Sequence, residues 1–514
     1  MRQTHFDSRE PLRRIRSGWL GTFACVVLAI GLVACAANPS AGRTRRVMSE
    51  EDEIELGREA AAQVEQSMGF AGSAELHAYL TRIGQRLAKH SSRSHLDYEF
   101  HVVDMKEPNA FALPGGHIYV SRGLLALMND EAELATVLGH EIGHVAARHS
   151  AQRQAKSRPW IPLQVLAGIG GAAASVVSPA LGSAVAGAGQ LPAALAMASY
   201  SRKQEAEADR LGQQYAAAEG WDPAALASSM DALTREQQLE GGRDPNRQSF
   251  FDSHPTTPDR AHDAREHATT LPVASPNPIA ANRAAFVGRL DGLVVGDSVK
   301  AGVFLDHRFM HPELGFAMSF PVGWAHANAP TAVVAQPEDG SAVLALQVAG
   351  EGDDPAAAAD RFDSEIPLLE RSGLTEINQL PAVTGVARIV DRGREIYLFL
   401  AWITKDDLVY QVLGAAPASR WDQHRLRFEA AAKSFHQLSE SELREVRENR
   451  LRLVEAHRGE TLGQIAARSR SQWSASKMAV ANDMTAEEEL AGGESIKISK
   501  RERYQGAGGV IENR

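Results

Sequence analysis

The hydrophobic positions divide the chain into a region of helical periodicity and a later region of alternating periodicity. In the first region, apolar residues recur at the spacing of one helix face: Leu134, Val137, Leu138, Ile142 and Val145. The later region predicts strands at Ala342–Val348, Val386–Val390, Ile396–Trp402 and Leu408–Leu413, flanked by helical patterns at Ala356–Leu369 and Trp421–Ser434. The pattern therefore indicates several domains, with helices first and an α+β module after them.

The first helical pattern carries the sequence His140-Glu141-x-x-His144. The two histidines are one turn apart, so both rings project from one face and can bind one metal ion. Glu141 follows the first histidine, where a carboxylate can accept a proton from a metal-bound water. This spacing is typical of a zinc peptidase, although histidine pairs also occur on unrelated helix surfaces, so a third ligand is required.

A second helical pattern begins near Ser201 and places Glu205 and Asp209 one turn apart. Glu205 can be the third ligand, which leaves a fourth position open for water, as a catalytic site requires. Asp209 can accept the remaining ring N–H of a histidine ligand and fix its tautomer. The alternative is that Glu205, Glu207 and Asp209 form an ordinary solvated acidic face.

Four segments, which follow one another along the sequence, carry a resemblance to a known family. They are Pro108–Val120, followed closely by Gly123-Leu-Leu125, and then His144–His149, Ser201–Asp209 and Ser253–Arg260. Together with His140-Glu141-x-x-His144 they resemble the zinc metallopeptidases that include the CaaX prenyl protease, HtpX and BepA. The resemblance extends from about Ser49 to Leu290. It implies a mostly helical gluzincin domain with a small β-sheet, one Zn²⁺ per chain, and protein or peptide substrates.

By the same resemblance, the segment before the zinc helix forms a sheet edge beside the cleft. An extended substrate could pair there through main-chain hydrogen bonds, and the residues expected to bind it are Asn109, Ala110, Phe111 and Ala112. Pro114-Gly115-Gly116 is in its own right a strong turn signal, so the segment can also be a simple hairpin.

Relatives of this kind place a histidine at the position of His254, where it can reach the metal. His254 is therefore a candidate catalytic residue, either as a reversible fourth ligand or as a group that stabilises the transition state. The alternative is a loop histidine that packs only on its neighbours. We expect His149 to be structural and Arg260 to order the loop after His254.

The N-terminus has the layout of a secretory signal over residues 1–34, with arginines before the apolar run Gly18–Val33. The run ends in Leu32-Val-Ala-Cys35, which resembles a bacterial lipobox, so we expect lipidation of Cys35 and a linker over residues 35–48. The protein would then be periplasmic and anchored by lipid to the membrane, by resemblance the outer membrane of a Gram-negative bacterium. An uncleaved membrane anchor is the alternative, which the short apolar run disfavours.

The chain has 514 residues and a formal net charge of −10, which argues against nucleic acid as a partner. The stretch from Ile161 to Ser201 has no charged residue and is rich in Ala and Gly. Its prolines and small residues disfavour a membrane span, so paired helices or a mobile flap are expected instead.

After a metallopeptidase domain at 49–290, Ala284–Val299 resembles a linker, and residues 300–440 predict an α+β module faintly similar to PsbP. Residues 450–502 resemble a LysM module, a strand, two helices and a closing strand that bind N-acetylglucosamine chains. Peptidoglycan is thus a further expected partner, with a purely structural cap as the alternative. Residues 503–514 are expected to be a disordered tail.

These patterns predict a zinc endopeptidase that hydrolyses misfolded or unassembled envelope proteins by Glu-assisted attack of a zinc-bound water. Two alternatives from other classes are a chaperone-like outer-membrane assembly factor and a peptidoglycan-binding scaffold, each with little proteolytic activity. The intact Glu141 speaks against the first, because a structural zinc site needs no general base. Neither alternative excludes the enzyme.

Overall fold

The structure is a computed structural model that describes residues 48–156, 199–239, 241, 250–255, 259–329, 332–391 and 393–506. The expected signal segment, Cys35, and residues 161–198 of the uncharged stretch lie outside this set. Among the residues that are described, no helix combines the length and the apolar character needed to cross a membrane.

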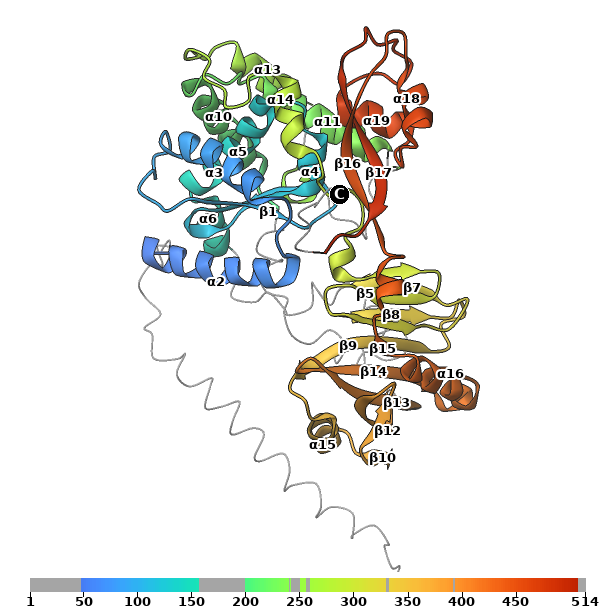
Figure 1. Ribbon diagram of the computed structural model, residues 1–514. Coiled ribbons are helices and arrows are strands. Elements are labelled where there is room, and N and C mark those ends of the chain that lie inside the picture. The colour runs from blue at the N-terminus through green and yellow to red at the C-terminus, as the bar shows by residue number, and fades with distance from the viewer. Residues whose placement is uncertain are drawn as a thin grey trace, which may run out of the picture. The chain divides into compact units, whose positions relative to one another are not determined.

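The first part of the described chain is mainly helical (Figure 1). Its longer helices are α2 (Glu50–Met68), α3 (Ala74–Ala88), α5 (Glu131–Ala146), α10 (Arg202–Ala218) and α11 (Ala225–Leu239), and its shorter ones are α4 (Arg122–Leu127), α6 (His149–Lys156), α12 (Phe250–Ser253) and α13 (Arg260–Ala268). The predicted helical region is thereby confirmed.

A small three-stranded sheet accompanies these helices, in the order β1 (Glu99–Val103), β3 (His117–Ser121), β2 (Ala110–Ala112). Strand β1 is parallel to β3, and β2 is antiparallel to it. Residues Pro114–Gly116 turn the chain between β2 and β3, and Gly115 and Gly116 adopt φ values of +82° and +107° that favour glycine. The segment is thus both a hairpin and a sheet edge.

Helix α5 runs through the centre of this core. Asp130 caps its first turn, because its carboxylate accepts a hydrogen bond of 2.8 Å from the Glu133 N–H. The helix is buried almost all round, and its larger apolar residues are at most 4 % exposed: Leu134, Val137, Leu138, Ile142 and Val145.

The first turn of α5 is also anchored by a buried carboxylate. Glu131 accepts hydrogen bonds from the Tyr79 hydroxyl at 2.6 Å and the Trp221 indole at 2.8 Å. It also accepts the backbone N–H groups of Ile279 and Ala280, at 2.6 and 2.5 Å. A buried charge needs such compensation, and here it ties α5 to three distant segments.

Helices α5 and α10 pack backbone against backbone. A Cβ atom on Gly139 would lie 2.8 Å from the Gly212 carbonyl oxygen, and one on Gly212 would lie 2.5 Å from the His140 nitrogen. One turn further along, a Cβ on Gly143 would lie 3.0 Å from the Ala208 carbonyl oxygen. Only glycine permits this approach, which brings the acidic residues of α10 beside the histidines of α5.

The second part of the described chain is rich in strands, as predicted. The larger sheet has the path β10-β12-β13-β14-β9-β8-β7, and β11 pairs with β12. Its strands are β7 (Ala325–Ala329), β8 (Ala332–Gln336), β9 (Val343–Glu351), β10 (Leu368–Arg371), β11 (Thr375–Ile377), β12 (Leu380–Asp391), β13 (Arg394–Lys405) and β14 (Leu408–Pro417).

A smaller sheet of four strands has the order β15-β6-β5-β4. Its strands are β4 (Val303–Leu305), β5 (Arg308–His311), β6 (Phe316–Ser319) and β15 (His436–Gln437). Helix α16 (Trp421–Lys433) packs through Phe428 into one apolar cluster of this region, and helix α15 (Pro355–Glu365) packs through Ala359 into the other.

Helix α15 is shorter than the sequence pattern predicted. The pattern placed its end at Leu369, but the helix ends at Glu365, and Leu368–Arg371 form β10 against β12. Pro367 explains the difference, since a proline disfavours helical geometry in the residue before it. Ile366 is accordingly extended, with φ −131° and ψ 104°.

The expected linker over Ala284–Val299 is also wrong. This segment contains α14 (Arg283–Val287), and the side chains of Phe286 and Val287 are completely buried. Beyond α14, the Gly292 and Val295 N–H groups donate to carbonyl groups of β16 (Arg447–Glu455), a strand more than 150 residues later. Local patterns do not reveal such pairing.

The last described segment consists of β16, α18 (Leu462–Ser469), α19 (Ala475–Asn482) and β17 (Ser495–Arg503), with β16 and β17 antiparallel. It is bonded to the first part, because the buried Lys497 ammonium donates to the carbonyl groups of Ala126 and Met128 at 2.9 and 2.7 Å. Order extends past the expected start of the tail, since the Tyr504 N–H donates to the Val446 carbonyl at 3.1 Å. Residues 507–514 lie outside the described set.

We predict that Gly212→Ala separates α5 from α10. The added methyl group has no room, and overpacking of this kind costs about 1–3 kcal/mol. Urea unfolding should show this loss, and metal analysis should show weaker zinc retention.

Gly288→Ala is the matched control, because Gly288 has an ordinary φ of −57° and a Cβ there would meet nothing within 4 Å. Equal stability of the Gly212→Ala and Gly288→Ala variants would contradict the close helix contact.

Candidate metal centre

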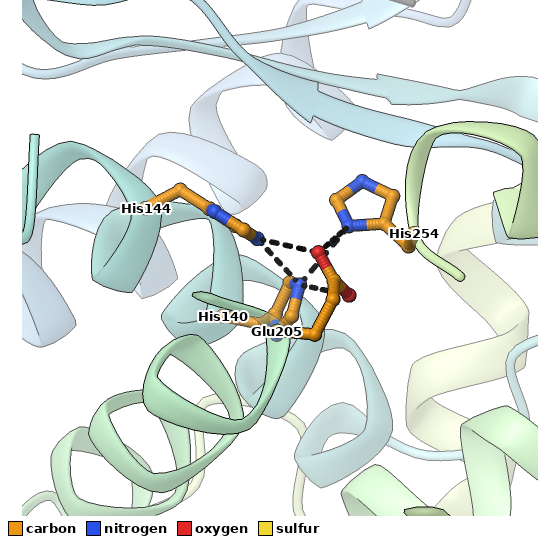
Figure 2. A group of neighbouring side chains, drawn as sticks. All are labelled: His140, His144, Glu205 and His254. Atoms are coloured by element: carbon orange, nitrogen blue, oxygen red, sulfur yellow. Dashed lines mark hydrogen bonds and ion pairs between the residues drawn. The ribbon is translucent and has the colours of Figure 1, made fainter. Parts of the chain in front are cut away.

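Four side chains from three elements converge in the core of the helical part (Figure 2). His140 and His144 come from α5, Glu205 from the first turn of α10, and His254 from the residue after α12. Their candidate ligand atoms all lie within 4.8 Å of one another, and each of the four residues is at most 1 % exposed. The structure thus places the three sequence-expected ligands and His254 around one point.

Four distances among these atoms are close to those of a tetrahedral metal site. His140 Nε2 lies 3.0 Å from His144 Nε2 and 3.2 Å from His254 Nδ1. Glu205 Oε1 lies 3.4 Å from His144 Nε2 and 3.2 Å from His254 Nδ1. Ligands about 2.0–2.1 Å from a tetrahedral zinc ion stand roughly 3.3 Å apart. Three imidazoles and one carboxylate therefore form a donor set that zinc accepts.

The outer partners of His140 and Glu205 are also in place. His140 Nδ1 lies 2.9 Å from Asp209 Oδ1, so Asp209 can hold the ring with Nε2 toward the centre. Arg260 donates two hydrogen bonds of 2.7 Å to the Asp209 carboxylate, and its third nitrogen lies 2.8 Å from Glu205 Oε2. The guanidinium of Arg260 therefore contacts both acidic residues rather than only ordering its loop.

The surroundings set the charge states of these groups. Burial by itself would raise the pKa of Asp209, but the contacts with Arg260 and His140 outweigh it and lower the pKa to about 2. Burial likewise opposes ionisation of Glu205, yet His254 and its other neighbours hold the pKa well below its usual range. Burial also lowers the pKa of His144 and favours the neutral ring that metal binding requires.

Glu141 lies beside this centre without a hydrogen bond. Its side chain is completely buried, and within the described residues neither of its carboxylate oxygens has a hydrogen-bond partner. His254 lies close by, with its Nε2 3.6 Å from Glu141 Oε1. Burial raises the pKa of Glu141, which suits a group that both accepts and returns a proton.

Three of the four expected substrate-binding residues form β2, beside this centre, and Asn109 directly precedes that strand. Asn109 and the three residues of β2, Ala110, Phe111 and Ala112, are all at most 5 % exposed. The carbonyl oxygen of Ala110 lies 3.3 Å from His254 Nε2, which can donate to it. The sheet edge is therefore adjacent to the centre and is covered at that carbonyl.

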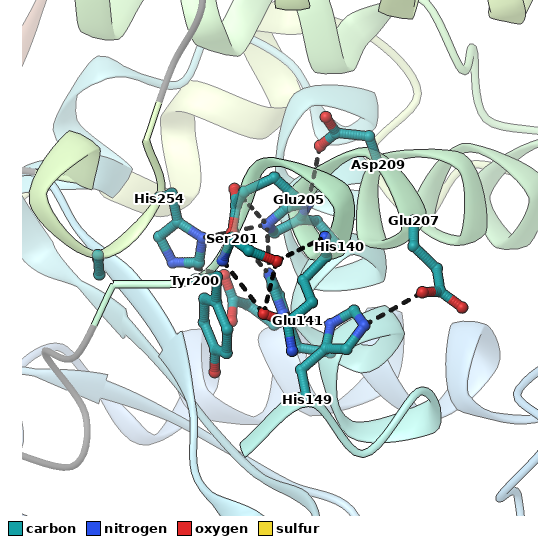
Figure 3. Close-up of polar contacts among 12 residues, drawn as sticks. His140, Glu141, His149, Tyr200, Ser201, Glu205, Glu207, Asp209 and His254 are labelled. Carbon is teal, nitrogen blue, oxygen red and sulfur yellow. Dashed lines mark hydrogen bonds and ion pairs between the residues drawn. The ribbon is translucent and has the colours of Figure 1, made fainter. Parts of the chain in front are cut away.

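Three further residues near the centre were not identified as functional from the sequence (Figure 3). The Tyr200 ring stacks on His144 with centroids 3.9 Å apart. His149 Nδ1 lies 2.9 Å from His144 Nδ1, and His149 Nε2 lies 3.3 Å from Glu207 Oε2. Arg148 and His149 belong to a segment that the sequence analysis quoted. The contact of His149 with His144, however, depends on a backbone turn at Arg148 that no spacing rule predicts.

Comparison with known proteins agrees with this geometry. A sequence profile described as peptidase family M48 matches residues 74–268. Metalloprotease LoiP of Escherichia coli K12 is 33 % identical over 188 residues, which cover 36 % of this chain and 68 % of that protein. The chain belongs to peptidase family M48. The predicted metallopeptidase family is thus confirmed, and the family implies a metal, typically zinc.

Other relatives match only in part. The beta-barrel assembly-enhancing protease of Escherichia coli K12 is 29 % identical over 232 residues, which are 45 % of this chain and 46 % of that protein. This chain thus spans about half the length of the first relatives that it matches. The solution structure of cyanobacterial PsbP from Synechocystis covers 26 % of this chain and 95 % of its own, with 17 % identity and a TM-score of 0.22, too low to assign a fold.

We predict that the wild-type chain binds one zinc ion and that Glu205→Ala loses it. The change removes one ligand and the Glu205 contact of the buried Arg260 guanidinium, so zinc binding should weaken at least roughly tenfold. Chelator competition followed by elemental analysis measures this, with exposed Glu266→Ala on α13 as the control. Equal zinc content in both variants would exclude Glu205 as a ligand.

Proposed function

We propose that this protein is a zinc-dependent endopeptidase that hydrolyses peptide bonds in misfolded or unassembled proteins of the cell envelope. The observation that carries the proposal is the buried Glu141 carboxylate, which has no hydrogen-bond partner among the described residues and lies beside a four-donor centre. A structural zinc site needs no such group, because its ligands already complete the coordination. Membership of peptidase family M48 supports the same reaction class.

In this proposal His140, His144 and Glu205 hold Zn²⁺. When bound, the ion lowers the pKa of water and polarises the carbonyl group that is attacked. Glu141 accepts a proton from the attacking water and returns it to the leaving amine as the peptide bond breaks. Its raised pKa brings its proton affinity closer to that of the groups with which it exchanges the proton.

The edge strand supplies a place for the substrate backbone. An extended peptide could pair with Ala110–Ala112 through main-chain hydrogen bonds, a mode that demands little of the substrate sequence. Low sequence demand suits an enzyme that removes unfolded proteins.

His254 is proposed to be a reversible fourth ligand. Its Nδ1 faces the centre, while its Nε2 can donate to the Ala110 carbonyl. One side chain thus occupies both the fourth donor position and a hydrogen-bonding site of the edge strand. It must move away before a substrate can use either, which favours the ligand role over packing alone.

The compartment and the last module belong to the same proposal. We propose lipidation at Cys35 and attachment to the outer membrane on the periplasmic side; the name of the beta-barrel assembly-enhancing relative supports an envelope role. The strand–helix–helix–strand order of residues 447–503 supports a LysM-like module. Its bonds from Lys497 to the first part favour the structural-cap alternative over peptidoglycan binding.

We predict that Glu141→Gln abolishes proteolysis but keeps zinc. The amide cannot accept the proton, and loss of a general base costs about 10²–10⁴-fold in rate. Casein cleavage by the purified chain, with zinc determined in parallel, tests this, and Glu266→Gln is the control. A Glu141→Gln variant that cleaves like the wild type would refute the assigned role.

We also predict that His254→Ala raises casein cleavage, because it removes the donor that closes the fourth position. Zinc content should remain near one per chain, since three ligands remain. If wild type and His254→Ala both hold zinc and neither cleaves casein, the centre is structural and the chaperone-like alternative is favoured.

A further inference from the structure

His149 contacts the metal ligand His144 on the side away from the donor atoms. The two Nδ1 atoms are 2.9 Å apart, whereas His144 Nε2 belongs to the four-donor group. The His149 side chain is completely buried. Its other ring nitrogen, Nε2, lies 3.3 Å from Oε2 of Glu207, whose side chain is 54 % exposed (Figure 3).

This geometry fixes the position of each ring proton. A ligand imidazole offers the Nε2 lone pair to the metal, so the proton of neutral His144 resides on Nδ1. His149 Nδ1 must accept that proton in a hydrogen bond, and the His149 proton then resides on Nε2. From there it is donated to the Glu207 carboxylate, which completes a chain from Glu207 through His149 to His144.

The backbone is bent to make this contact. Arg148, between α5 and α6, has a φ of +54°, an unusual and strained value for a residue with a side chain. Had α5 continued, a residue five positions after His144 would point about 140° away from it around the helix axis. The left-handed turn at Arg148 instead returns His149 to the ring of His144.

Two contacts hold the turn in place. Arg148 Nε donates to Glu53 Oε2 at 2.7 Å, and a second Arg148 nitrogen donates to the Met48 carbonyl at 2.6 Å. A strained conformation that is anchored in this way beside a metal ligand points to a functional purpose.

We infer that His149 is a positioning residue for His144 and links its Nδ1–H to the carboxylate of Glu207. Asp209 has the corresponding place beside His140, but there the carboxylate contacts the ligand ring directly. The chain through His149 orients the His144 ring and increases its basicity toward the metal. The inference rests on the proposed zinc site.

Three variants test the hydrogen-bonded path from Glu207 through His149 to His144. The measurement is zinc affinity, determined by chelator competition. His149→Phe keeps a flat ring but no acceptor, so affinity should fall about 10–100-fold. His149→Asn puts an amide oxygen near the position of Nδ1 and should recover most of the loss. Glu207→Gln removes only the charge at an exposed position, so its loss should stay below about tenfold. His262→Phe, on the exposed surface of α13, is the control.

The ranking decides the outcome. The hydrogen-bonded path is supported if zinc affinity is highest in the wild type, lower in His149→Asn and Glu207→Gln, and lowest in His149→Phe. The visible spectra of the Co²⁺-loaded variants should then also be shifted from that of the wild type. Unchanged zinc affinity in His149→Phe overturns the inference. Equal weakening in both His149 variants, with Glu207→Gln unaffected, also overturns it, because His149 would then act on His144 by packing alone.

If His149→Phe does not fold, the Glu207→Gln variant decides the question. Weaker zinc affinity with an unchanged melting temperature of the metal-free protein supports the hydrogen-bonded path. Wild-type zinc affinity overturns it. Failure of the proposed function is distinguishable, because the wild type would then bind no zinc or Glu141→Gln would remain active. Neither result depends on His149.

Discussion

The backbone contact between α5 and α10 is the constraint on which the centre depends. One helix supplies His140, Glu141 and His144, and the other supplies Glu205 and Asp209. Zinc ligands must lie within a few tenths of an ångström of their places, so two helices kept apart by side chains would leave the carboxylate out of reach. The glycines at 139 and 212 remove that spacing, and the packing of α5 in the core prevents it from yielding.

The sequence predicted the parts of the centre that follow from helix periodicity. A separation of four residues is enough to place His140 beside His144, and Glu205 beside Asp209. The contacts that the sequence did not reveal depend on geometry outside a regular element. His149 reaches His144 only through the positive φ of Arg148, and segment 292–295 pairs with a strand near residue 450. Pro367 shows a different case, because the proline was visible in the sequence, but the apolar pattern alone carried the predicted helix past the true end of α15.

Closure of the centre and cover of the edge strand depend on one side chain. His254 presents Nδ1 to the donor group and Nε2 to Ala110, and its backbone N–H donates to the Phe250 carbonyl at 2.9 Å. The Phe250 ring stacks on the His254 ring with centroids 4.4 Å apart. Movement of α12 would therefore release the metal position and the strand together. In the proposed function, this would couple access of water to access of substrate.

The charges around the centre explain why a divalent ion belongs there. Glu141, Glu205 and Asp209 are buried acidic groups, and Arg260 is the one guanidinium among the described residues that contacts Glu205 and Asp209. With all three carboxylates ionised, two negative charges remain uncompensated in a medium where each is expensive. A dication balances them, whereas without it two protons are needed, which His254 and Glu141 could hold. Metal binding and folding stability are therefore coupled, because the ion restores neutrality to a core that α5 and α10 have already closed.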